Sequence, residues 1–138
     1  MPVVWTPEAG LARIRQGALR GIFMGANIVR NEVLRLIQQT PKTGREYRRR
    51  GVTHTASAPG EAPASDTGAL VREVRVSVDE AKLTATVNSG AAYAAALEFG
   101  TPTMQPRPYM RVALQNTRER VVQVVNEEIR KALEANGG

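Results

Sequence analysis

Apolar side chains recur at spacings of three, four and seven residues over the first third of the chain, which is the period of one helix face. The pattern predicts a helix over residues 6–39, with Thr6 as N-cap, Pro7 at the first helical position and Pro41 beyond its end. The apolar stripe of this helix comprises Leu11, Ile14, Ala18, Ile22, Val29, Val33 and Leu36.

Three glycines within this helix, Gly17, Gly21 and Gly25, lie four residues apart and therefore on one face. Each glycine costs a helix about 0.5–1 kcal/mol relative to alanine. Two interpretations stay open: the glycines only bend the helix, or they allow close packing against another helix or a neighbouring subunit. The shared face slightly favours close packing.

Residues 40–67 show no sustained period and are rich in Pro, Gly, Ser, Thr, Ala and Arg, so we expect a long extended loop. The loop would be disordered in the free protein or ordered by contact with a neighbour. Its first part is basic, and a single carboxylate, Glu46, opposes the cluster. Such a cluster suits a solvated surface, an acidic protein or nucleic-acid phosphates. Its cations are Lys42, Arg45, Arg48, Arg49 and Arg50.

Strict alternation of apolar and polar residues follows the loop and predicts an antiparallel β-hairpin over residues 69–88. Asp79-Glu80-Ala81 would form its turn. Because a lone hairpin is marginally stable in water, its apolar face must lie on the helices or join a larger sheet. That face comprises Val74, Val76, Val78, Leu83, Ala85 and Val87.

Two further helices are predicted, a short one over 91–99 that Gly100 and Pro102 stop, and a long one over 108–135 that Pro108 starts. The chain, residues 1–138, is thus expected to be one domain of the α+β class. The long N-terminal and C-terminal helices would pack on a small antiparallel β-sheet.

Composition excludes several classes of function. The formal net charge is +6, and aromatic residues make up only 4%, so the core must be built from aliphatic side chains and would gain from burial against other copies. The absence of cysteine excludes disulfides, thiolate metal sites and cysteine nucleophiles. No signal-peptide pattern and no membrane-spanning stretch is expected.

Residues suited to catalysis are scarce. His54 is the only histidine and lies in the polar loop with no local partner, while Glu127 and Glu128 are consecutive and so point apart on a helix. No metal-ligand or phosphate-loop spacing occurs. We therefore expect no enzymatic activity, and we predict no catalytic, cofactor-binding or metal-binding residue.

The run from Tyr93 to Leu114 carries the most specific pattern. Four short motifs follow one another here in an order and spacing that resemble the signature of the tail-component family of long-tailed bacteriophages. The motifs are Tyr93-Ala94, Leu97-Glu98-Phe99-Gly100-Thr101, Arg107-Pro108-Tyr109-Met110-Arg111 and Ala113-Leu114. The resemblance extends upstream to Ala58-Pro59-Gly60-Glu61-Ala62-Pro63 and Asp66-Thr67-Gly68. Tyr109, Met110 and Val112 depart from it, since phenylalanine, leucine and proline are usual there; each keeps an apolar anchor.

This resemblance implies a non-enzymatic virion protein of the neck or tail-completion group, assembled in the bacterial host cytoplasm. Such proteins form homo-oligomeric rings, a hexamer to match the tail, at the head–tail junction. The implied partners are head-completion or connector proteins on one side and tail-tube or tail-terminator proteins on the other. DNA would pass through the ring without sequence-specific binding. A joining ring and a tail terminator are both compatible with the signature.

The expected subunit interface surrounds the turn that Pro102, Pro106 and Pro108 stiffen, because a stiff loop loses less entropy on binding. Its aromatic residues would form either a small intramolecular core or an interface anchor. Glu98 would pair with Arg107 or Arg111, within or between subunits. The expected interface residues are Tyr93, Glu98, Phe99, Thr101, Arg107, Tyr109 and Arg111.

Two rival functions remain. The first is a nucleic-acid-binding module that uses the Lys42–Arg50 loop on phosphates, and it predicts affinity that falls steeply with salt. The second is a hydrolase that uses His54, and it has little support because no partner for the imidazole is evident.

Overall fold

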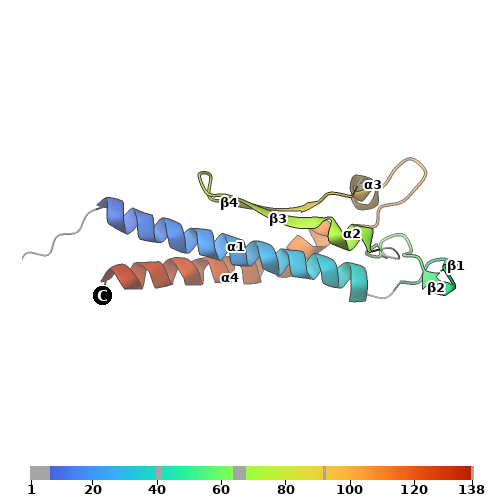
Figure 1. The fold of residues 1–138 in the computed structure, drawn as a ribbon, viewed down its shortest axis with the longest axis horizontal. Coiled ribbons are helices and arrows are strands. Elements are labelled where there is room, and N and C mark those ends of the chain that lie inside the picture. The colour runs from blue at the N-terminus through green and yellow to red at the C-terminus, as the bar shows by residue number, and fades with distance from the viewer. Residues whose placement is uncertain (1–6, 40–41, 64–67, 92, 138) are drawn as a thin grey trace, which may run out of the picture.

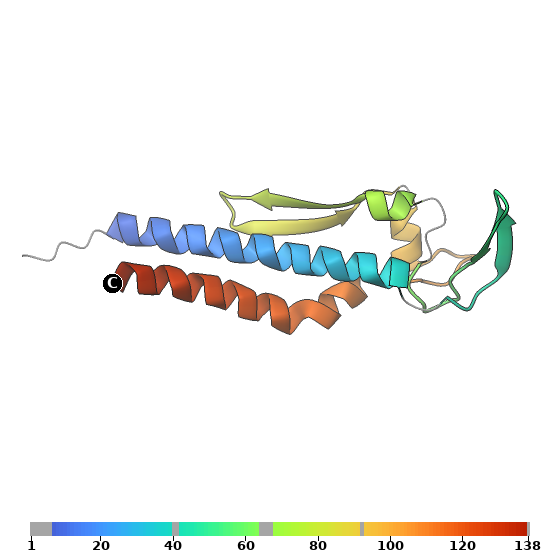
Figure 2. The same cartoon turned by 60° about the horizontal axis from the view of Figure 1, so that its bottom comes forward.

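The computed structural model describes residues 7–39, 42–63, 68–91 and 93–137 (Figure 1). Thr6, the expected N-cap, and residues 64–67 of the expected loop lie outside these ranges. Two long helices, α1 (Pro7–Gln39) and α4 (Met110–Gly137), run antiparallel side by side along the length of the molecule (Figures 1 and 2). The helical period of the sequence therefore predicted both helices to within a few residues.

The seam between α1 and α4 is narrow because the three glycines of α1 face α4. A Cβ added at Gly17 would lie 2.8 Å from the carbonyl oxygen of Glu128, and one at Gly21 would lie 2.8 Å from Cα of Val125. Real Cβ atoms essentially never approach other atoms this closely. The close neighbour of the glycine face is thus α4 of the same chain.

A two-stranded antiparallel sheet covers the side of α1 opposite α4, so the body has three layers: sheet, α1, α4 (Figure 2). Strand β3 (Val74–Asp79) pairs with β4 (Thr84–Ser89) in a register that sets Val76 opposite Val87. The alternation in the sequence predicted these strands. Leu83, however, lies in the turn with φ 52° and not in the strand, and the short helix α2 (Ala69–Arg72) occupies the start of the expected hairpin.

The most buried part of the core lies along the C-terminal half of α1. This is where helices α1 and α2 meet strand β3 and the first turn of α4. As expected from the composition, the buried side chains are aliphatic except for one tyrosine. The buried cluster comprises Val29, Val33, Leu36, Ile37, Leu70, Val74, Tyr109 and Ala113.

The expectation that residues 40–67 form a loop without secondary structure is wrong. Strands β1 (Glu46–Arg49) and β2 (Val52–Thr55) pair as a second antiparallel hairpin, which extends beyond the end of the helical body (Figures 1 and 2). Arg50 and Gly51 form its two-residue loop with φ 54° and 77°, the positive values typical of tight hairpin turns. Each strand has only four residues, and none of their described side chains is fully buried, so burial leaves no period in the sequence. The protein is accordingly α+β with two small sheets.

Candidate functional site

The residues of the Tyr93–Leu114 run link helix α3 (Ala94–Phe99) to the start of α4. Gly100 ends α3 with φ 78°, and a Cβ there would lie 2.9 Å from the carbonyl oxygen of Met104, so this turn requires glycine. The chain returns through an isolated β-bridge between Thr101 and Met104, and the amide of Arg107 donates to the carbonyl oxygen of Leu97 at 2.6 Å. The two helices are therefore held close together by main-chain hydrogen bonds.

Glu98 supplies the cap of α4 from a distant position in the sequence. Its Oε2 accepts hydrogen bonds from the amides of Tyr109 (2.9 Å) and Met110 (3.0 Å), and its Oε1 accepts one from the amide of Arg111 (3.0 Å). No acidic residue lies in the first turn of α4, so this buried carboxylate provides the negative charge that the N-terminus of a helix favours. Backbone amides are thus the main partners of Glu98.

The two arginines expected to pair with Glu98 have different positions. The guanidinium of Arg111 lies 3.9 Å from the Glu98 carboxylate and is half exposed, so it adds a weak ion pair to the amide contacts. Arg107 does not pair with Glu98 in the described structure; its Nε donates to the carbonyl oxygen of Ser57 at 3.2 Å. Arg107 therefore connects the turn to the segment that follows the β1–β2 hairpin.

Two aromatic residues of the run, Phe99 and Tyr109, have opposite environments. Tyr109 is fully buried, its hydroxyl donates to Oγ of Ser89 at 2.7 Å, and burial raises the pKa of its phenol. Phe99 is 71% exposed although it is strongly apolar. Tyr109 is therefore a core residue, whereas Phe99 is available to a partner.

An apolar groove of about 460 Å³ lies beside Phe99. It is lined by Val29 of α1, Ala85 and Val87 of β4, and Met110 and Leu114 of α4, together with Glu98, Phe99 and Arg111. Leu114 is 53% exposed. We call this surface the Phe99 groove. Sequence reasoning missed its floor, because no local signal joins Val29 to residues of β4 and α4.

The remaining expected interface residues lie around the groove rather than in it. Tyr93 is exposed at the start of α3 and, with Arg107, lines a separate shallow hollow that also includes Tyr47. Thr101 is exposed in the turn after α3. The structure thus brings Glu98, Phe99 and Arg111 together.

The base of the β1–β2 hairpin is held by two charged residues whose roles the sequence did not reveal. The ammonium of Lys42 donates to the carbonyl oxygens of Leu36 and Ala62, each at 2.8 Å, and its burial lowers its pKa. Glu61 accepts from the amides of Thr43 and Ala58, each at 2.9 Å, and from the Thr43 hydroxyl. These bonds lower the pKa of Glu61 to about 2. Lys42 is therefore a structural residue rather than a free surface cation.

The side chains of Arg45, Arg48 and Arg50 are exposed on the hairpin, while that of Arg49 lies outside the described part of the structure. His54 stacks on Tyr47 with ring centroids 5.6 Å apart and 25° between the ring planes. Over the described ranges, no cluster of three or more His, Cys, Asp or Glu side chains could hold a metal ion. None of the helices in those ranges is long and apolar enough to cross a membrane.

The fold and the groove define an α+β protein with two long antiparallel helices, two small hairpins and an exposed apolar surface at the α3–α4 junction. Comparison of the chain with protein families, with curated proteins and with solved structures found no match.

Proposed function

We propose that this chain is a structural subunit of a bacteriophage virion, which forms a homo-oligomeric ring at the head–tail junction. The proposal combines the resemblance of the Tyr93–Leu114 run to the tail-component signature with one structural observation. That observation is the exposed Phe99 beside an apolar groove, in a chain with only two phenylalanines.

Some side chains of the run are buried and others are exposed. Glu98 and Tyr109 hold α3 and the start of α4 in place, whereas Phe99 and Leu114 remain exposed. Aromatic side chains exposed beside an apolar groove are typical of protein–protein interfaces. Burial of the exposed part of Phe99 would contribute about 3 kcal/mol, taking about 25 cal/mol per Å² of apolar surface.

The partner that we assign to the Phe99 groove is a second copy of this chain. If the groove of one copy accepts a different surface of the next copy, the contact is heterologous, and repetition of such a contact closes a ring when the rotation permits. A sixfold ring would match the tail. Head-completion or connector proteins and tail-tube or tail-terminator proteins would contact its two ends.

The test measures oligomer mass by light scattering after size exclusion and examines the same sample by negative-stain electron microscopy. We expect the wild type to form rings and Phe99→Ser to shift the assembly to monomers, with each contact weakened about 100-fold by the loss of about 3 kcal/mol. Phe23→Ser is the matched control, because Phe23 is 52% exposed on α1 and does not line the groove. A wild type that stays monomeric at high concentration contradicts the proposal.

A further inference from the structure

The β1–β2 hairpin is a rigidly anchored basic arm. The antiparallel hydrogen bonding continues beyond the two strands toward the base of the hairpin. The amide of Gly44 donates to the carbonyl oxygen of Ala56 at 2.8 Å, and the amide of Ala56 donates to the carbonyl oxygen of Arg45 at 2.9 Å. Lys42 and Glu61 fix the base as described above. The arm extends beyond the end of α1, away from the sheet of β3 and β4 (Figure 2).

Three guanidinium groups on this arm have no carboxylate partner among the described residues. Arg45, Arg48 and Arg50 are exposed, and Arg48 donates a long hydrogen bond of 3.4 Å to the carbonyl oxygen of Gly51. By contrast, Arg20, Arg35, Arg111 and Arg130 each lie within 4.0 Å of a carboxylate, as Arg130 does with Glu127 at 2.8 Å. The arm therefore concentrates unneutralised positive charge at one end of the molecule.

The arm has the surface chemistry of a phosphate-binding element rather than of a protein interface. Protein interfaces have an apolar core, yet the described exposed side chains of the arm are arginine, glutamate and threonine. Tyr47 and His54 lie opposite each other in the register, and their stacked rings hold the two strands of the arm together. A two-stranded ribbon also has dimensions that fit the major groove of DNA.

We propose that the β1–β2 hairpin binds the phosphate backbone of duplex DNA without sequence preference, through Arg45, Arg48 and Arg50. This binding goes beyond the ring function and is independent of the Phe99 groove. Its contacts are few, so it is weak at high salt. Because each neutralised phosphate contributes about −0.9 to the slope of log K against log salt, three contacts give a slope of about −2.7. Affinity then falls about 40-fold between 50 and 200 mM salt.

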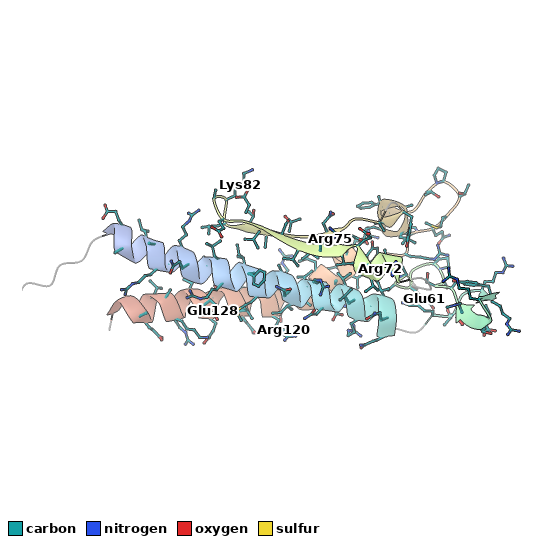
Figure 3. The ribbon with its side chains drawn as sticks, viewed as in Figure 1. Glu61, Arg72, Arg75, Lys82, Arg120 and Glu128 are labelled. Carbon is teal, nitrogen blue, oxygen red and sulfur yellow. The ribbon has the colours of Figure 1, made fainter. Side chains whose placement is uncertain are left out.

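The experiment measures fluorescence anisotropy of a labelled 30-base-pair duplex with the full chain over this range of salt. The triple variant Arg45→Gln, Arg48→Gln, Arg50→Asn removes the three positive charges assigned to DNA binding, and asparagine suits the positive φ at position 50. The control variant Arg75→Gln, Lys82→Gln, Arg120→Gln removes the same charge from exposed residues of β3, its turn and α4, which lie away from the arm (Figure 3).

We expect the arm variant to lose most of the binding and most of the salt slope, while the control variant keeps both to within about threefold. A second scrambled-sequence duplex should bind equally well. Three results overturn the proposal: no binding by the wild type at 50 mM salt, equal losses in the two variants, or equally tight binding to polyglutamate of matched charge. The last result would indicate an acidic protein as the partner. None of these outcomes depends on whether the chain forms a ring, which the Phe99→Ser experiment measures separately.

Discussion

Removal of the Glu98 carboxylate should destabilise the protein more than any change to its exposed charges. The side chain is buried and accepts three amide hydrogen bonds at 2.9–3.0 Å from the first residues of α4. Those amides cannot find partners within α4, because the first four N–H groups of a helix lack intrahelical acceptors. The substitution Glu98→Ala therefore leaves three donors unsatisfied beside the core.

The magnitude follows from these three bonds. A hydrogen bond to a charged group contributes about 1.5–3 kcal/mol, but the neighbouring Phe99 groove lets water replace part of the lost contacts. We expect Glu98→Ala to reduce the free energy of unfolding by about 3 kcal/mol, which for 138 residues lowers Tm by about 10 °C. Glu98→Gln should cost about half as much, because its carbonyl oxygen still accepts from two amides while its NH₂ group opposes the third.

The assay is urea unfolding followed by circular dichroism at 222 nm, at a protein concentration where the oligomeric state is the same for all variants. Glu119→Ala is the control, because Glu119 is an exposed glutamate of α4, the helix that Glu98 caps, and we expect a change within about 0.5 kcal/mol. Arg111→Ala tests the ion pair at 3.9 Å and should cost under about 1 kcal/mol. The capping argument is refuted if Glu98→Ala costs less than about 1 kcal/mol, or if Glu98→Gln costs as much as Glu98→Ala.

Two further predictions concern the helix seam and the base of the hairpin. Gly21→Ala should destabilise the protein by about 1–2 kcal/mol in thermal unfolding, because crowding against Cα of Val125 outweighs the gain in helix propensity. Asn31→Ala, at an exposed position of the same helix, is the control and should not destabilise the protein. A stabilised Gly21→Ala variant would contradict the close packing of α1 against α4. The pKa of Glu61 is lowered to about 2 from 4.5, so the stability that it contributes is present above pH 4.5 and is lost as the pH falls through about 2. The amide NMR resonance of Thr43 should titrate with a midpoint near 2 in the wild type and show no such step in Glu61→Gln, whereas a midpoint near 4.5 would exclude the hydrogen-bonded geometry.

The sequence predicted those elements in which buried and exposed side chains alternate regularly over many residues. It did not predict the elements in which no such alternation occurs. The stripe of α1 and the alternation of β3 extend over enough residues to identify each element. The β1–β2 hairpin has neither length nor a buried face, and its turn uses Arg50-Gly51 in place of the more usual Asn-Gly. The one available signal was Gly51 between short runs of β-branched and aromatic residues.

The sequence indicated which segment forms the candidate site but not how the side chains of that segment are arranged in space. Tyr109 and Phe99 are both aromatic and both flank the same turn, yet one is buried and the other is exposed. Which of them packs inside depends on the angle at which α4 leaves the turn and meets α1, and that angle is a tertiary property. The role of Glu98 was missed for a related reason, since sequence rules seek a helix cap directly before the helix, whereas this cap comes from the end of the preceding helix.

The arrangement couples the stability of the fold to the shape of the Phe99 groove. Glu98 and Phe99 are consecutive, and the carboxylate that caps α4 also fixes the position of the last turn of α3, from which Phe99 extends. A change at Phe99 should therefore alter assembly while leaving the monomer's free energy of unfolding within about 0.5 kcal/mol, as for other surface substitutions. A change at Glu98 should alter both, because loss of the cap frees the wall of the groove that Met110 and Leu114 form. If Glu98→Gln weakens assembly by as much as Phe99→Ser while the folded monomer remains populated, the interface depends on the rigidity of the α3–α4 junction as well as on its apolar surface.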